Sequence, residues 1–304
     1  MINKKRENFA STELDRLFMS KNVDDVVQFY DSFSSRHELI QWMRLRHKPE
    51  VGLKELDGNK DIVVLILTAN FNGKFVERCI NEIYPGLHTI LIGGEGYNNS
   101  YFNPAYYLNS GIERAISYNP KWIIISSDDM RPIHSVDKLK SSLEVIDESK
   151  VDVVFTEPSK YHSIPNNLSG ANLFRILFFK LKRERRKQLI IEKKFHVKLF
   201  PVPVKGIRHW FYRKGFYYVS MASFGIISGN LIKKIGTKIF DENFPIGGFD
   251  DDFSIRVIKE NFTFTFIDYK IGDMFGSTLG TDMSRKLRDL AGLIYLNEKW
   301  WNLL

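Results

Sequence analysis

Asp128 and Asp129 are the first residues in this sequence that could do chemistry. They follow an apolar run, residues 122–125, that predicts a buried β-strand, so they bring carboxylates to the edge of a dry sheet. Ionised groups in such a place are costly unless they are paired or bound to a cation. Mg²⁺ and Mn²⁺ take oxygen ligands and commonly share them with a substrate diphosphate. The alternative is that one aspartate only caps the turn before Pro132.

A second acidic segment, Asp250-Asp251-Asp252, follows a glycine pair and precedes a predicted helix. One aspartate is enough to cap the free N–H groups of a helix, and three consecutive carboxylates repel one another. A metal or a proton-transfer role would give the other two a reason. A solvated acidic loop is the alternative interpretation.

Alternating strands and helices would position both acidic segments. Strand-length apolar runs lie at 61–68, 88–93, 122–126, 151–156, 223–228 and 263–268. Helical segments lie between them at 74–82, 104–118, 135–148, 230–235 and 253–260. This order predicts an α/β fold with a mostly parallel, doubly wound sheet. Such sheets bind ligands beyond the carboxyl ends of their strands, which here read Thr68-Ala69-Asn70, Gly93-Gly94-Glu95-Gly96 and Ser127-Asp128-Asp129.

Three other regions lie outside this alternation. Residues 1–58 predict a helical N-terminal extension, with helices beginning near Ser11, Asn22 and His37. Residues 48–50 and 56–59 break the pattern and predict a linker. Residues 160–220 form a basic, aromatic insertion within a domain that spans 59–285, and residues 286–304 predict a C-terminal helix.

The order of these motifs resembles the inverting glycosyltransferases of family 2, which have the GT-A fold. Thr68-Ala69-Asn70 is similar to the end of their first strand, and Asn109-Ser110-Gly111-Ile112 with Ala115 to a pattern on their second helix. Ser127-Asp128-Asp129, with Pro132 three residues on, resembles their Asp-x-Asp motif. Segments 228–236 and 240–244 resemble their acceptor side, and 247–256 their Gly-Glu-Asp-x-Asp motif with its trailing Arg. The resemblance covers about residues 61–280 and implies a GT-A-type twisted sheet flanked by helices in the 59–285 domain.

The sequence departs from the family pattern at four places. Ser127 stands where the first Asp of the Asp-x-Asp motif usually lies, and Phe249 replaces the usual Glu before Asp250. Asp273 occupies roughly the place of a late metal-binding His. The second strand ends in Gly93-Gly94-Glu95-Gly96 instead of Asp-x-Gly-Ser, which bears on recognition of the base.

The resemblance implies metal-assisted transfer of a sugar, with inversion, from a UDP- or GDP-linked donor to a hydroxyl of a glycan, lipid-linked or protein acceptor. Mn²⁺ or Mg²⁺ would be held by Asp129 and Asp273. Asp250 would be the general base, with Asp252 beside it in the catalytic site. The implied donor-binding residues are Thr68, Asn70, Glu95, Asn109 and Asp128. The implied acceptor-side residues are Gly229, Asn230, Gly248 and Arg256.

Composition excludes several classes of protein. The 304 residues are 43% hydrophobic and 26% charged, which excludes wholesale disorder. No apolar run approaches the ~20 residues that span a bilayer, and the start of the chain has no apolar signal-peptide region. A single cysteine, Cys79, excludes an internal disulfide framework and a Cys-based zinc site. We therefore expect a cytoplasmic enzyme that is not an integral membrane protein.

Residues 172–183 mix large apolar side chains with a basic flank, a pattern typical of an interfacial helix, and residues 180–198 carry most of the excess positive charge. Contact with an anionic membrane surface is therefore an expected partner interaction, and nucleic acid is not expected. A helix packed on the core is the alternative. A competing function is a non-catalytic protein with a degenerate GT-A fold, which binds nucleic acid or membrane through the insertion. A sugar-nucleotide nucleotidyltransferase would need a glycine-rich basic loop, but residues 68–74 have one Gly and one Lys.

Overall fold

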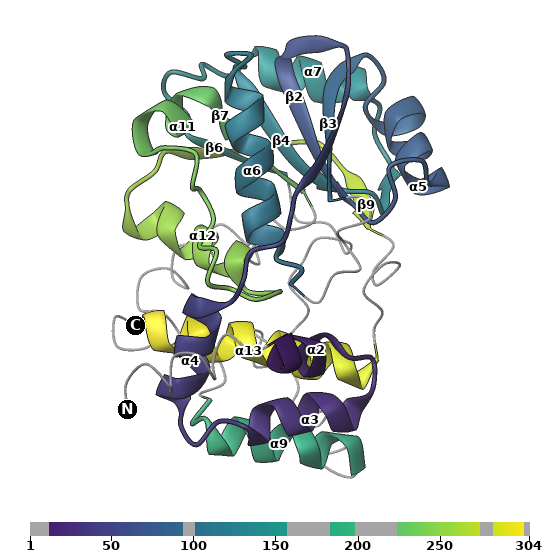
Figure 1. The fold of residues 1–304 in the computed structure, drawn as a ribbon. Coiled ribbons are helices and arrows are strands. Elements are labelled where there is room, and N and C mark those ends of the chain that lie inside the picture. Colours follow the sequence, from purple (N-terminus) through teal and green to yellow (C-terminus); the bar gives the residue numbers. More distant parts are fainter. Residues whose placement is uncertain (1–11, 94–100, 157–182, 198–223, 274–281, 301–304) are drawn as a thin grey trace.

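The computed structural model describes residues 12–93, 101–156, 183–197, 224–273 and 282–300. In it, an α/β unit stands on a bundle of helices (Figure 1). Glu95 and most of the 160–220 insertion lie outside the described residues, so the predictions for them are not addressed by the structure. Within the described residues, no helix is long and apolar enough to cross a bilayer.

The α/β unit is built on a mixed sheet. The described strands pair in the order β1-β3-β2-β4-β7-β6-β8. Their bounds are Gly52–Leu56 for β1, Asn59–Thr68 for β2, Leu87–Gly93 for β3, Trp122–Ser127 for β4, Val153–Thr156 for β6, Phe224–Ser228 for β7 and Phe264–Ile267 for β8. β3, β2, β4, β6 and β8 run in one direction, whereas β1 and β7 are antiparallel to their neighbours. The predicted α/β class with a mostly parallel sheet is confirmed, and the arrangement is compatible with a Rossmann-like fold.

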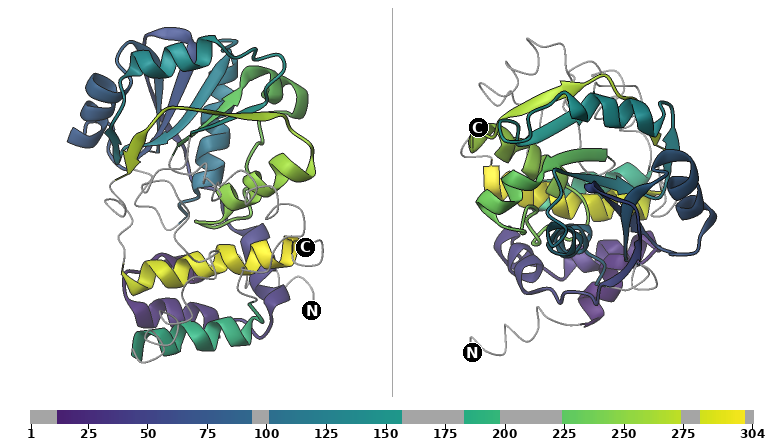
Figure 2. Two further views of the ribbon diagram at one scale, coloured as in Figure 1. Left: turned by 180° about the vertical axis from the view of Figure 1, so that it is seen from behind. Right: turned by 90° about the horizontal axis from the view of Figure 1, so that it is seen from above.

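Helices cover both faces of the sheet, which is why the central strands are apolar without interruption (Figure 2). Val63 and Leu65 of β2 share one hydrophobic cluster with α6 (Pro104–Ile116), α11 (Gly229–Ile235) and α12 (Phe249–Lys259). Val64 and Ile66 point to the other face. There they pack with α5 (Lys74–Arg78), the π-helix η1 (Cys79–Ile83) and α7 (Val136–Glu144). The period-2 alternation along β2 therefore serves two cores at once.

The structure corrects three details of the sequence prediction. Part of the predicted linker forms β1, an edge strand that pairs with β3. The strand at 224–228 runs antiparallel to β4, because it returns from the insertion at the carboxyl end of the sheet and not from a crossover helix. The acidic segment is no loop: α12 begins at Phe249, so all three aspartates lie in its first turn.

The helical bundle combines three separate parts of the chain (Figure 1). α2 (Thr12–Met19), α3 (Val23–Asp31) and α4 (Arg36–Leu45) confirm the predicted N-terminal helices, and α9 (Arg183–Lys194) and α13 (Met283–Trp300) pack with them. The side chain of Asn22 caps α3 by accepting from Asp24 N at 2.9 Å. The Tyr30 hydroxyl donates to Leu287 O at 2.6 Å, which joins α3 to α13.

A buried guanidinium joins the bundle to the α/β unit. Arg46 follows α4 and donates to Asp15 Oδ1 of α2 at 2.6 Å, and both side chains are 1% exposed. The same guanidinium donates to Phe102 O, just before α6, and to Pro245 O, just before α12, each at 2.9 Å. One side chain thus ties together the bundle, the start of α6 and the approach to α12.

Arg46→Met is expected to lower the free energy of unfolding by about 3–5 kcal/mol, because it leaves Asp15 buried without its counter-charge. Urea unfolding followed by circular dichroism measures this loss. Arg16→Met is the matched control, since Arg16 pairs with Glu13 on the surface and should change stability by less than about 1 kcal/mol. Adding Asp15→Asn to the Arg46→Met variant should recover part of the loss. Equal losses in the Arg46 and Arg16 variants would contradict the assignment.

Candidate functional site

The carboxyl ends of β2 and β4 bring Thr68 and Asp128 into contact. Thr68 Oγ1 donates to Asp128 Oδ2 at 2.7 Å, and Asp128 N donates to Leu67 O at 3.1 Å. The Cys79 thiol of η1 donates to Asp128 O at 3.4 Å. Asp128 is only 7% exposed, although it lies just beyond the end of a strand. The predicted rim of polar residues at this edge of the sheet therefore exists for β2 and β4.

The surroundings of Asp128 disfavour its ionised form. Burial raises the pKa of its carboxyl group, and the charge of Asp129 raises it further, against the lowering effects of the Thr68 hydrogen bond and the charge of Arg78. An ionised Asp128 is thus poorly compensated by the surrounding protein. A divalent cation would supply the missing positive charge.

Asp129 is followed by a strand that pairs with the segment containing Asp273. Ser127 Oγ donates to Asp129 Oδ1 at 2.6 Å, so this serine orients the carboxylate of Asp129. Directly after Asp129, β5 (Met130–Pro132) pairs antiparallel with β9 (Ile271–Asp273), and Met130 lies opposite Asp273. The backbone of Asp273 is therefore close to that of Asp129. The side chain of Asp273 is not among those described.

Asp128 and Asp129 fit the needs of a Mg²⁺ or Mn²⁺ ion only if other ligands come from elsewhere. Among the described residues, no group of three or more His, Cys, Asp or Glu side chains could hold a metal. Mg²⁺ is commonly bound through one or two carboxylates plus waters and substrate phosphates. Two oxygen-bearing side chains at a strand end match that mode of binding.

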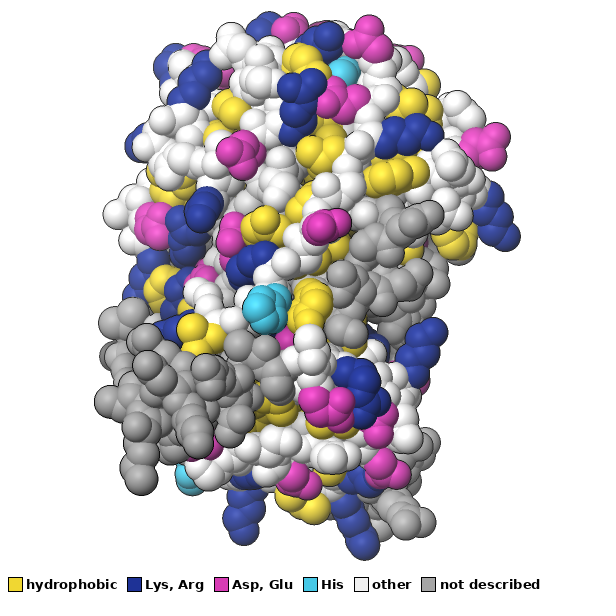
Figure 3. Space-filling view, viewed as in Figure 1, with side chains coloured by type: hydrophobic (Ala, Val, Ile, Leu, Met, Phe, Trp, Pro, Cys, Tyr) yellow, Lys and Arg dark blue, Asp and Glu magenta, His cyan; other side chains and the backbone are white. Residues whose placement is uncertain are grey.

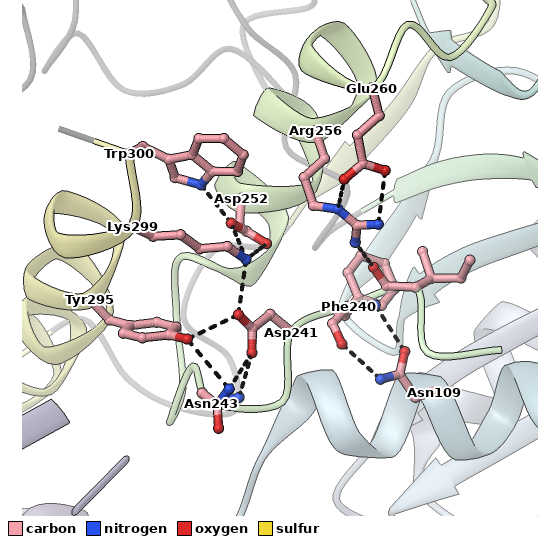
Figure 4. Close-up of polar contacts among 11 residues, drawn as sticks. Asn109, Phe240, Asp241, Asn243, Asp252, Arg256, Glu260, Tyr295, Lys299 and Trp300 are labelled. Carbon is pink, nitrogen blue, oxygen red and sulfur yellow. Dashed lines mark hydrogen bonds and ion pairs between the residues drawn. The ribbon is translucent and has the colours of Figure 1, made fainter. Parts of the chain in front are cut away.

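The predicted donor-binding residues divide between two places. Asn70 lies at the rim, where its backbone N–H donates to Thr68 Oγ1 at 3.1 Å. Asn109 lies in the middle of α6, 4% exposed, and its amide donates to Phe240 O at 2.8 Å and accepts from Phe240 N at 3.0 Å (Figure 4). The structure places Asn109, predicted to bind the donor, away from the rim, where its side chain holds the backbone of the segment that leads to α12.

Asp252 is committed to the C-terminal helix. It is fully buried and accepts from Lys299 Nζ at 2.9 Å and from Trp300 Nε1 at 2.6 Å, both from α13 (Figure 4). Lys299 Nζ also donates to Asp241 Oδ2 at 2.9 Å. The structure thus places the predicted catalytic residue Asp252 in a buried ion pair, where it joins α12 to α13.

Asp250 lies in the first turn of α12, which is tied to the start of α6 and packs against α13. The segment before α12 is fixed to the start of α6 by a hydrogen bond from Asn103 Nδ2 to Glu242 O, at 2.8 Å. α6 begins beyond the carboxyl end of β3. The segment bonded to its start therefore passes the carboxyl end of the sheet and leads into α12, next to α13 (Figure 1). There the half-buried Asp250 adds to the raised pKa of Asp289 on α13, a rise caused first by partial burial and opposed by Arg285.

The loop before α12 contains Gly247 and Gly248 and contacts the backbone of α13. A Cβ on Gly292 of α13 would lie 1.9 Å from Gly247 O, so the helix and the loop touch through their backbones. Gly248 has a φ of +94°, a conformation that favours glycine. Gly248 therefore shapes the turn into α12. Lys299, Asp241 and Asp289 surround the first turn of α12, and no local pattern in the sequence pointed to them.

Gly229 and Asn230 lie near the amino end of β4, at the opposite end of the strands from Asp128. Because β7 is antiparallel to β4, Ser228 pairs with Trp122 at the amino end of β4, and Gly229 N donates to Lys121 O at 2.9 Å. The prediction that these two residues line the acceptor side of the same site is therefore corrected. Arg256, the fourth predicted acceptor-side residue, pairs with Glu260 and donates to Ile239 O at 2.6 Å (Figure 4).

Comparisons of this chain with protein-family models, with curated proteins and with solved structures find no match. The site must therefore be interpreted from its own geometry.

Asp241→Asn is expected to lower the free energy of unfolding by about 1–3 kcal/mol at pH 7, because it weakens the bonds to Lys299 and Tyr295. Burial alone would raise the pKa of Asp241, but hydrogen bonds from Lys299, Asn243 and Tyr295 lower it overall. A lowered pKa stabilises the folded protein above the ordinary value, near 4, and this contribution is lost as the pH falls through the folded value.

Urea unfolding between pH 7 and pH 3 tests this prediction, and the difference between the two proteins should shrink toward pH 3. Asp61→Asn is the control, since Asp61 pairs with Lys121 at the surface and should change stability little at any pH. A difference that stays constant or grows on acidification would contradict the role of Asp241.

Proposed function

We propose that this protein is an inverting glycosyltransferase that uses a nucleotide-diphosphate sugar and a divalent cation. The observation that carries the proposal is the buried Asp128 beside Asp129 at the carboxyl end of β4, in contact with Thr68 at the end of the neighbouring β2. Chain connections leave β2 toward β3 on one side and return to β4 on the other. Open α/β sheets bind their ligands at such a reversal of strand order.

The residues divide the work by position. Asp128 and Asp129, with Asp273 on the paired strand, would hold Mn²⁺ or Mg²⁺. When bound there, the cation would offset the charge of the diphosphate and assist its departure. Thr68 orients Asp128, and Ser127 orients Asp129. In this arrangement Ser127 supplies a hydrogen bond to Asp129, and a third carboxylate at position 127 is not needed to hold the cation.

Asp250 is the residue we assign as general base. Of the three aspartates in the first turn of α12, Asp252 is fully buried in an ion pair with Lys299, and Asp250 is half-buried at the start of the helix. A carboxylate there would take the proton from an acceptor hydroxyl as it attacks the anomeric carbon. The acceptor, whether glycan, lipid-linked or protein, would enter from the side of α12 and α13.

Asp129→Asn is expected to remove metal-dependent nucleotide binding. In the wild-type protein, UDP or GDP at about 100 times its Kd, with Mn²⁺, should raise Tm by about 5 °C, and neither nucleotide alone should do so. Differential scanning fluorimetry measures both proteins. Asp61→Asn, the same change at the amino end of β2, is the control and should keep the full shift. A wild-type shift that is independent of metal, or absent with every nucleoside diphosphate, would contradict the proposal.

Asp250→Asn is expected to lower turnover about 10²–10⁴-fold and to leave the nucleotide-induced Tm shift unchanged, because a general base acts on the acceptor and not on the donor. The measurement is release of nucleoside diphosphate from UDP- and GDP-sugars in the presence of candidate acceptors. Asp251→Asn, the neighbouring carboxylate, is the control and should retain most of the activity. Wild-type turnover by the Asp250 variant would remove it from this role.

A further inference from the structure

Among the residues that the structure describes, α9 contacts the bundle through one side. Ile191 and Phe195 are buried against the other helices, and the ring of Phe195 lies 5.7 Å from that of Tyr30. Lys187 pairs with Asp24 of α3, and Lys194 Nζ donates to Tyr30 O at 2.9 Å. The lysines that face α3 are therefore already used in holding the helix.

The opposite side of α9 carries an exposed stripe of Arg186, Ile190 and Lys193. These residues are spaced i, i+4 and i+7, so they lie on one helix face. Arg186 and Lys193 are exposed, and Ile190 is 64% exposed although it is a large apolar side chain. Figure 3 shows basic side chains on either side of an apolar patch at the end of the molecule where α9 lies, far from the sheet.

Positive charge is concentrated in this part of the sequence. Residues 180–198 contain nine Lys and Arg and two Glu, so 9 − 2 gives +7, against +8 for the whole chain. Acidic residues of α3 offset part of this charge, but they do so through Lys187 and Lys194 on the inner side. The outward stripe keeps its own charges.

We propose that the outward stripe of α9, made of Arg186, Ile190 and Lys193, binds the surface of an anionic lipid bilayer. Basic side chains are attracted to anionic headgroups, and an apolar side chain between them can enter the interface. A nucleic-acid phosphate backbone would use the two charges but would gain nothing from an exposed isoleucine. α9 lies on the side of the bundle away from the sheet, so such binding leaves the α/β unit in solution (Figure 2).

Co-sedimentation of the full chain with vesicles tests the proposal. The protein should bind vesicles of phosphatidylcholine with 30 mol% phosphatidylglycerol, and pure phosphatidylcholine vesicles should not bind it. Each basic residue at an anionic surface contributes about fivefold to the partition coefficient, so Arg186→Gln with Lys193→Gln should lower it about 25-fold. Ile190→Ser should lower it about tenfold, through lost burial of the side chain.

Matched controls lie at the far end of the molecule. Lys121→Gln with Lys150→Gln removes two exposed charges near the amino ends of β4 and β6, and Val145→Ser removes an 85% exposed apolar side chain after α7. Both should bind vesicles as the wild type does, and unchanged Tm values show that every variant is folded.

Two results would overturn the proposal: equal loss of binding in the control variants, or tighter binding to a DNA or RNA duplex that does not depend on Ile190. The measurement uses no nucleotide or metal, so its failure is distinct from failure of the proposed function.

Discussion

The buried Arg46 is the interaction on which the arrangement of the two parts depends. A guanidinium removed from water requires a counter-charge and hydrogen-bond acceptors, and here they come from Asp15, Phe102 O and Pro245 O. These partners belong to the bundle, to the start of α6 and to the approach to α12. Because all three must converge on one side chain, the bundle is held at the carboxyl edge of the sheet, and α12 lies between them.

The C-terminal helix α13 makes a second set of polar contacts that join the bundle to α12 and to the segment before it. Lys299 lies between Asp241 and Asp252, so a single ammonium compensates two carboxylates that would otherwise repel each other. Close contact of Gly292 with Gly247 O sets how near the helix can approach. The two neighbouring aspartates therefore differ in their surroundings. Asp252 is fully buried and paired with Lys299, and Asp250, two residues earlier, is half-buried at the start of the helix. Sequence proximity alone gives no means of predicting that the two side chains lie in such different surroundings.

The sequence predicted the elements whose formation depends on neighbouring residues, such as buried strands and capped helix starts. The apolar run of β2 reports burial on both faces, and Asn22 marks a helix start because its side chain caps one. What the sequence did not reveal depends on distant partners. β1 was missed because an edge strand with an exposed Lys54 lacks a continuous apolar pattern. The direction of β7 is not encoded in its composition. Because β7 runs antiparallel to β4, Gly229 and Asn230 lie near the amino end of β4, whereas the prediction placed them at the carboxyl end. Nothing within several residues of Asp252 predicts its pairing with Lys299.

The charges at the two ends of the molecule have opposite consequences for ligands. At the sheet edge, Asp128 and Asp129 lie side by side, and burial already disfavours the ionised form of Asp128. A diphosphate brought to such a place meets like charge, and the distant basic residues of α9 cannot offset it because solvent screens charges beyond about 10 Å. A divalent cation bound between the carboxylates and the phosphates would remove this repulsion. Metal-free binding of a diphosphate at this edge would therefore be inconsistent with the carboxylates that the sheet places there.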